Sequence, residues 1–301
     1  MKKFLILFIV LIGLTSCKEN TEKQTTSDET LNSIDNSVEL TEKQKNLKKN
    51  AIPIQNLSKL SDKIYDEIAN NEIIMIGEMH GTNEPAEFAY GLCNLITKSE
   101  KNVVLALEIR SSQMNNLSDE MSITQLKELD FFRRKNFDGR NGESMLNLIY
   151  KSNQNERIIL KFIDNAYPSS SRDSSMYTEI RNIHNKYPNT KIVTLTGNVH
   201  NSFKPLFDEV RIGGYLLKDS VNFYAKKIMS INHVFSEGSM LNNDGTGLKI
   251  STFEREDNIY NTTLPHDMFL YKKFPEEQNE YTHILYTDKV TASGIVKKDN
   301  R

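Results

Sequence analysis

The sequence predicts an α/β protein with a central, mostly parallel sheet flanked by helices and extended by strands near the C-terminus. Four short apolar runs alternate with helical patterns, as in βαβ units. These runs are Glu72–Gly77, Val103–Leu107, Ile158–Ile163 and Ile192–Thr196. Beyond residue 213, short strand patterns separated by turns predict strands that extend the same sheet. These patterns are Val221–Ile231, Leu248–Phe253, Met268–Tyr271 and Thr282–Tyr286.

Helical spacing of apolar residues fills the intervals between the four runs. Before the first run, apolar residues recur at helical intervals from Leu57 to Ile68. After it, Asn83 can cap a helix with Pro85 in its first turn. The remaining helices are marked by Ile123, Leu126 and Leu129, by Met145, Leu148 and Ile149, and by Met176, Ile180, Ile183 and Tyr187.

The N-terminal segment predicts export and a membrane anchor. A short basic start precedes the apolar stretch Phe4–Leu14, which is too short to span a bilayer and is typical of a signal-peptide core. It ends in Leu14-Thr15-Ser16-Cys17, which resembles the bacterial lipobox. That resemblance implies cleavage after residue 16 and a lipid on the Cys17 thiol, and hence a location in the bacterial cell envelope, on the periplasmic face or the cell surface. The alternative is an ordinary secretory signal with a chance cysteine.

Composition divides the rest of the chain into a tether and one domain. Residues 17–50 are polar and charged with almost no core-forming residues, so we expect a disordered tether. Residues 51–301 are enough for a single α/β domain. The net charge of −2 lacks the basic excess that nucleic-acid binding needs. The one further cysteine, Cys93, leaves no disulfide framework.

Ionisable residues follow each of the four apolar runs, and this placement predicts a single site. In an open α/β sheet, ligands bind in the crevice beyond the carboxyl ends of the strands. We therefore expect the side chains at these ends to converge. They are Glu78 and His80, Glu108, Asp164, and His200.

The segment Gly77-Glu78-Met79-His80-Gly81 carries the sharpest signal. In an extended segment Glu78 and His80 point to the same side. A histidine there can act as a general base near neutral pH or as a metal ligand. The alternative is a turn histidine that forms hydrogen bonds only for structure.

Three further residues complete the predicted site. His200 follows the fourth run in Gly197-Asn198-Val199-His200, although Asn198 could instead simply cap a helix. Glu108 could orient a histidine or be held ionised by one; alternatively it pairs with a cation such as Arg110. Arg140, in a turn that enters a helix, could hold a carboxylate or an oxyanion, or could be a solvated loop residue.

Several of these motifs resemble those of the erythromycin-esterase-like family, which is grouped with ChaN-type haem-binding lipoproteins and Tiki-type metalloproteases. The similarity spans about residues 55–290. The motifs that carry it are Ile76-Gly77-Glu78-Met79-His80-Gly81-Thr82, Ala106-Leu107-Glu108 and Thr196-Gly197-Asn198-Val199-His200.

The resemblance implies a hydrolase in which His80 activates water, while Glu78, Glu108 and His200 shape the site. The substrate would be a small molecule or a peptide with an ester or amide-like bond. Esterases of this family carry an arginine in the helix after the first motif; Glu84–Ser99 has none, so Arg140 is the substitute candidate. The alternative is a ChaN-type haem- or iron-binding lipoprotein. A divalent metal on Glu78, His80, Glu108 and His200, or a haem, stays open as cofactor.

The lipobox leads to a test of the anchor. We expect Cys17→Ser to move the protein out of the membrane fraction, because the substitution removes the thiol that carries the lipid. Membrane fractionation and mass spectrometry of the N-terminal peptide measure this. A Cys17→Ser protein that stays in the membrane fraction, with no lipid-modified peptide in the unsubstituted protein, would contradict the prediction.

Overall fold

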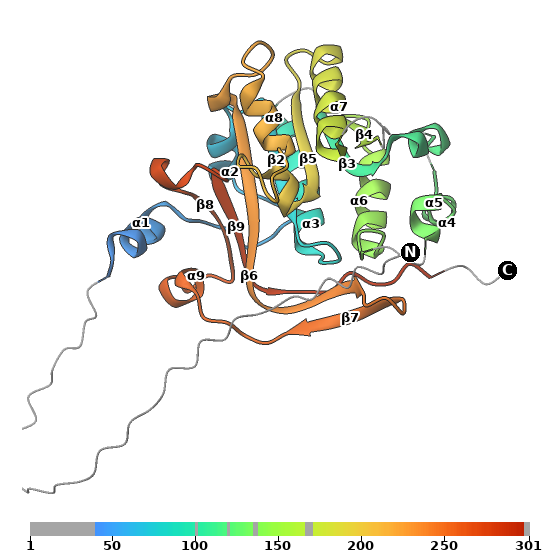
Figure 1. Ribbon diagram of the computed structural model, residues 1–301. Helices are drawn as coiled ribbons and strands as arrows, with labels where there is room; N and C mark the ends of the chain where they lie inside the picture. Colours follow the sequence, from blue (N-terminus) through green and yellow to red (C-terminus); the bar gives the residue numbers. More distant parts are fainter. Residues whose placement is uncertain (1–39, 100–101, 119–120, 135–137, 166–170, 298–301) are drawn as a thin grey trace, which may run out of the picture. The chain divides into compact units, whose positions relative to one another are not determined.

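The computed structural model describes residues 40–99, 102–118, 121–134, 138–165 and 171–297 of the chain (Figure 1). The predicted signal peptide, Cys17 and the tether as far as residue 39 lie outside these residues. Within the described ranges, no helix is both long and apolar enough to cross a bilayer.

In these ranges, nine strands form one sheet, which confirms the predicted α/β class. The order is β1-β8-β9-β6-β2-β5-β3-β4, with β7 paired to β6, and five of the eight pairings are parallel. The strands are β1 Ile52–Pro53, β2 Ile73–Glu78, β3 Val103–Arg110, β4 Ile158–Asp164, β5 Lys191–Gly197, β6 Ile228–Asn243, β7 Leu248–Phe253, β8 Met268–Lys272 and β9 His283–Val290.

Helices cover both faces of the parallel part of the sheet, which explains why its strands are apolar throughout. Ile74 and Ile76 of β2 pack in the core beneath α2, α3 and α6, whereas Ile73 and Met75 pack in the core beneath α7 and α8. The helices are α1 Glu42–Asn50, α2 Asp62–Ile68, α3 Glu84–Ser99, α4 Ile123–Lys127, α5 Asp130–Arg133, α6 Glu143–Asn153, α7 Arg172–Lys186, α8 Ile212–Lys218 and α9 Ile259–Thr263. Short 3-10 turns are η1 Ser111–Asn116, η2 Asn198–Asn201, η3 Ala225–Lys227 and η4 Pro275–Glu277.

The order of the strands reverses the direction of the chain across the sheet at one point. The chain passes from β2 through α3 to β3 and through α6 to β4. It then returns through α7 on the other face to β5, which lies between β3 and β2. Ligand sites of open α/β sheets lie at such reversals of direction, beyond the carboxyl ends of the strands.

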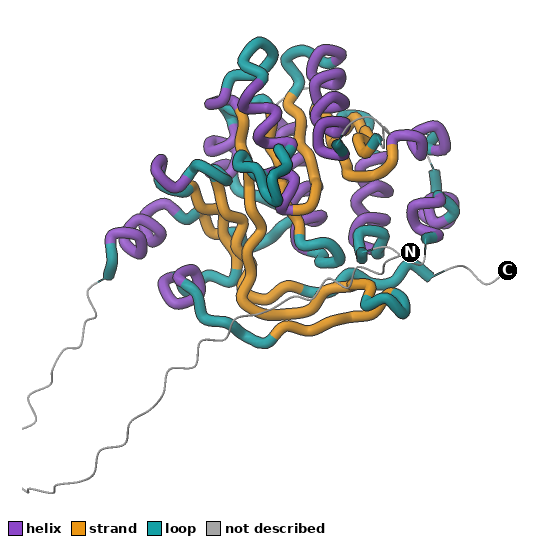
Figure 2. The backbone as a smooth tube through the Cα atoms, viewed as in Figure 1, coloured by secondary structure: helices purple, strands orange, loops and turns teal. Residues whose placement is uncertain are grey.

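The C-terminal strands confirm the predicted extension, with two changes of boundaries: the last strand, expected at Thr282–Tyr286, runs from His283 to Val290. The strand expected at Val221–Ile231 begins only at Ile228, after the η3 turn, and continues to Asn243. Its second half bends and pairs with β7 (Figure 2). Gly238, where this half begins, has φ +130° and lies against the Val290 carbonyl, a position that favours glycine.

Helix α1 corrects the predicted boundary between tether and domain. Glu42–Asn50 is a helix with a capping box between Thr41 and Gln44. Its single leucine, Leu47, is buried in a small core with residues of β8, β9 and the α9 region. Composition suggested a disordered segment because one apolar residue among nine is little core material. The structure nevertheless forms a capped helix with that residue docked.

The docking of α1 leads to a stability test. We expect Leu47→Ala to lower the free energy of unfolding by about 2–4 kcal/mol, since it removes a fully buried leucine side chain. The matched control is Lys48→Ala on the exposed side of the same helix, expected within about 0.5 kcal/mol of the parent. Denaturant unfolding measures both, and equal stabilities of the two variants would show that the helix does not contribute.

Candidate active site

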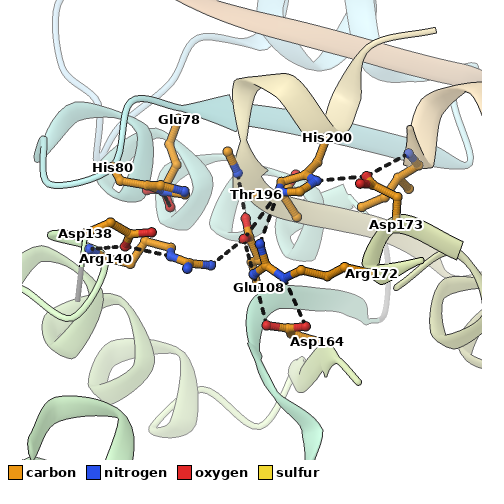
Figure 3. A network of polar contacts seen from close by, with 12 residues as sticks. Glu78, His80, Glu108, Asp138, Arg140, Asp164, Arg172, Asp173, Thr196 and His200 are labelled. Atoms are coloured by element: carbon orange, nitrogen blue, oxygen red, sulfur yellow. Dashed lines mark hydrogen bonds and ion pairs between the residues drawn. The ribbon is translucent and has the colours of Figure 1, made fainter. Parts of the chain in front are cut away.

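The four strands whose ends carry ionisable residues lie next to one another in the order β2-β5-β3-β4. Their carboxyl ends therefore bring Glu78, Glu108, Asp164 and His200 to one edge of the sheet, as Figure 3 shows. All six residues that the sequence nominated lie in this cluster, including His80 and Arg140. The cluster is held together by hydrogen bonds and ion pairs rather than by apolar contacts.

His80 and Glu78 form a pair just beyond β2. The Nδ1 atom of His80 lies 2.9 Å from Oε1 of Glu78, and the Glu78 side chain is buried. Burial lowers the pKa of His80, but the hydrogen bond to Glu78 and the charges of Glu78 and Glu108 outweigh it and raise the pKa above its ordinary value. When Nδ1–H donates to Glu78, the Nε2 lone pair of His80 is left to accept a proton.

His200 is paired in the same way with Asp173 of α7. Its Nδ1 lies 2.8 Å from Oδ1 of Asp173, which also accepts a hydrogen bond from the backbone N–H of Ile212 at 3.2 Å. Burial lowers the pKa of His200, but the hydrogen bonds to Asp173 and Glu108 raise it to about 9. His200 is therefore an imidazolium at neutral pH, with a proton on each ring nitrogen.

The two imidazoles face each other across Gly197. An added Cβ on Gly197 would lie 2.9 Å from Nε2 of His80 and 3.6 Å from Cδ2 of His200. These two ring atoms are thus separated by no more than about 6.5 Å, the sum of the two distances. That separation allows one water molecule or one substrate oxygen to contact both rings.

Glu108 lies at the centre of the cluster and is almost fully buried. One carboxylate oxygen forms ion pairs with Arg140 and Arg172, and the other accepts the backbone N–H of Gly197 at 2.8 Å. Burial alone would raise the pKa of Glu108, but His200, His80 and Arg140 hold it well below its usual range. Glu108 is therefore ionised at neutral pH and positions the surrounding cations.

Both arginines are fixed by a second carboxylate. The guanidinium of Arg172 forms a forked pair with Asp164 at 3.2 and 2.9 Å, and Arg140 Nε donates to Asp138 at 2.8 Å. The Nη1 atom of Arg172 also lies 3.4 Å from Nε2 of His200. A cationic surface therefore adjoins the space between the histidines.

Arg172 and Asp173 belong to the site, although sequence reasoning did not nominate them. They occupy the first turn of α7, which begins on the edge of the sheet where β4 ends. A helix that follows a parallel strand starts near the carboxyl end of that strand. When the residue at the strand end is a candidate site residue, the first charged residues of the next helix are therefore candidates too. Asp164, which the sequence analysis placed at the end of a strand, was the signal that could have pointed to Arg172 and Asp173.

The arrangement does not fit a divalent metal. Among the described residues, no group of three or more His, Cys, Asp or Glu side chains is placed to hold one. The donor atoms are also committed elsewhere: Glu108 accepts from two guanidinium groups, and Glu78 is paired with His80. A metal ion between the histidines would meet the Arg172 cation beside His200.

Comparison with known proteins places the fold. No protein-family model matches the chain, and neither does any curated protein. Among solved structures, a succinoglycan biosynthesis protein aligns with a TM-score of 0.66 at 11% identity, over 84% of this chain and 98% of that one. A mutant of the erythromycin esterase EreC aligns with a TM-score of 0.60 at 12% identity, over 82% of this chain and all of the esterase.

The chain shares the fold of an erythromycin esterase. This confirms the fold that the motifs suggested, and at such low identity it extends to the fold alone. ChaN of Campylobacter jejuni aligns with a TM-score of only 0.41, at 12% identity over 75% of this chain and 91% of that one. This looser likeness supports neither hydrolysis nor haem binding as the function of this chain.

The close approach of His80 to Gly197 leads to a test of the geometry. We expect Gly197→Ala to displace the His80 imidazole, because a methyl group would lie 2.9 Å from its Nε2 atom. The imidazole can rotate away, so the melting temperature should change by only a few degrees while the Nδ1–Glu78 hydrogen bond weakens. The NMR titration of His80 should then show a lower pKa. An unshifted His80 titration would contradict the geometry.

Proposed function

We propose that the protein is a hydrolase in which His80 activates water for attack on an ester or amide-like bond. The observation that carries this proposal is the placement of two histidines, each paired with its own carboxylate, on either side of Gly197. Each imidazole is oriented by its own carboxylate, Glu78 or Asp173, through Nδ1. Such orientation leaves the two Nε2 atoms for chemistry.

His80 is the base in this proposal. A water molecule near its Nε2 atom would lose a proton to the imidazole as its oxygen attacks the carbonyl carbon of the substrate. The resulting imidazolium is stabilised by the buried carboxylate of Glu78, 2.9 Å from Nδ1. The proton can then pass to the leaving group when the tetrahedral intermediate collapses.

His200 and the arginines would stabilise the negative charge that forms on the carbonyl oxygen. His200 is cationic at neutral pH, and its Nε2 atom lies 3.4 Å from Glu108, a long contact that leaves the proton available to a closer acceptor. Arg140 and Arg172 add positive charge that is fixed before the reaction begins. Preorganised charge of this kind is often the largest contribution to catalysis.

The lipid anchor on Cys17 and the location in the cell envelope belong to the same proposal. They rest on the signal-peptide pattern and on the cysteine that ends it. A hydrolase held at the membrane would act on small molecules or peptides of the envelope or its surroundings. Haem or iron binding, the alternative suggested by the sequence, has no specific support from the contacts of this site, and a haem titration followed by absorption spectroscopy tests it.

The proposed base predicts a pH dependence. Hydrolysis requires neutral His80, whose folded pKa is raised, so kcat/KM should rise with pH through a midpoint above about 6.5, the ordinary value for histidine. His80→Ala should lower the rate on the order of 10²–10⁴-fold. Glu78→Gln should move the midpoint to lower pH because it removes the charge that raises the pKa.

A panel of chromogenic esters and amides, assayed with the full chain from pH 5 to 10, measures these effects. His266→Ala, at an exposed histidine remote in sequence from the site, is the matched control and should behave as the parent does. Full activity in His80→Ala would refute the assignment of the base. A midpoint that does not move in Glu78→Gln would refute the role of the pair.

A further inference from the structure

We propose that the substrate of this site carries an anionic oxygen group, a carboxylate or a phosphate, which binds in an arginine-lined cavity next to Glu108. The inference rests on the proposed hydrolase function, to which it adds the class of substrate. It is based on the composition and size of the cavity and on the residues that the cavity shares with the active site.

The cavity has a volume of about 220 Å³ and shares three wall residues with the site. Glu108, Arg140 and Arg172 belong both to its wall and to the network around the histidines. A group bound there would therefore be part of the same molecule that presents a carbonyl to His80 and His200.

Four guanidinium groups line the cavity, against two carboxylates. The arginines come from four separate places in the chain: the end of β3, the residue after α5, the turn before α6 and the first turn of α7. They are Arg110, Arg134, Arg140 and Arg172, and the two carboxylates are Glu108 and Asp164. The wall thus presents more guanidinium groups than carboxylates, which favours an anion over a cation.

The type of cation in the wall restricts the class of anion that can bind. Arginine presents a rigid fork of N–H donors that matches the paired oxygens of a carboxylate or a phosphate. Both Arg140 and Arg172 are already oriented by carboxylates, Asp138 and Asp164, and so are held in place before a ligand binds. The groups that a ligand meets are therefore preorganised.

The volume of the cavity and the apolar part of its wall restrict the size and polarity of the rest of the ligand. The volume is below the roughly 300–1,000 Å³ of sites for drug-sized molecules, so a single small group and a short linker fill it. Ile109 and Phe131 supply apolar surface beside the arginines. An ester whose acyl or alcohol part ends, a few carbons from the carbonyl, in a carboxylate or phosphate fits this description.

A matched pair of substrates tests the inference by turnover. Mono-4-nitrophenyl glutarate and 4-nitrophenyl pentanoate have acyl chains of equal length and differ in the terminal charge. We expect kcat/KM to be at least about tenfold higher for the glutarate, as one charge-assisted hydrogen bond would provide. In Arg110→Gln and Arg134→Gln that ratio should fall towards one.

The control for these variants lies on the same segment of the chain. Arg133 precedes Arg134, is not part of the cavity wall and pairs with Glu128 instead. Arg133→Gln should retain the preference of the parent. Equal kcat/KM values for the two esters in the parent, or the same loss of preference in Arg133→Gln, would overturn the inference and leave the hydrolase proposal standing.

A binding measurement tests the anion site independently of the hydrolase proposal. Calorimetry with glutarate and with inorganic phosphate, against sodium chloride at equal ionic strength, needs no turnover. Tighter binding of phosphate would identify a phosphorylated substrate, and tighter binding of glutarate a carboxylate one. Anion binding that Arg110→Gln weakens at least fivefold, in a protein that hydrolyses no ester or amide, would support the anion site and refute the hydrolase. Failure of both anions to bind would overturn the anion site.

Discussion

The buried carboxylate of Glu108 is the constraint on which the rest of the site depends. An unpaired charge at this depth would be prohibitively costly, so the fold must surround it with cations and donors. It does so with Arg140, Arg172, His200 and the backbone of Gly197, drawn from segments that are far apart in sequence. The need to satisfy one carboxylate therefore fixes the relative positions of the loops that carry the chemistry.

The C-terminal part of the chain also holds the loop after β2 in place. The carbonyl of Gly81 accepts hydrogen bonds from the backbone N–H groups of Leu241 at 2.9 Å and Ser293 at 2.7 Å. Gly81 has φ +84°, and a side chain there would overlap the Leu241 carbonyl. The second half of β6, which pairs with β7, thus holds the turn that directs His80 towards Gly197.

Local patterns in the sequence were sufficient for the sheet and for six residues of the cluster. Buried parallel strands are continuous apolar runs, and Glu78, Glu108 and His200 stand at or just beyond their ends, so one rule located them. The same rule could not reveal that Arg172 reaches Glu108, because this contact depends on the placement of β5 between β2 and β3. Nor could it identify α1, since the partners of Leu47 come from strands more than 200 residues later.

The two histidines show how environment assigns different tasks to one residue type. His200 has two carboxylate neighbours within 3.4 Å, Asp173 and Glu108, and its pKa rises to about 9. The contacts of protonated His200 therefore stabilise the fold fully below pH 6.5, the ordinary value, and that stabilisation is lost as the pH rises through 9. Glu108 has a lowered pKa, so its contribution is present above its ordinary value of 4.5 and is lost in acid as the pH falls through the folded pKa. The ion-pair network is thus strongest in mildly acidic solution, whereas a neutral His80 needs a higher pH. A site built this way sacrifices part of its own stability at the pH where its base works, which accords with electrostatics selected for chemistry rather than for folding.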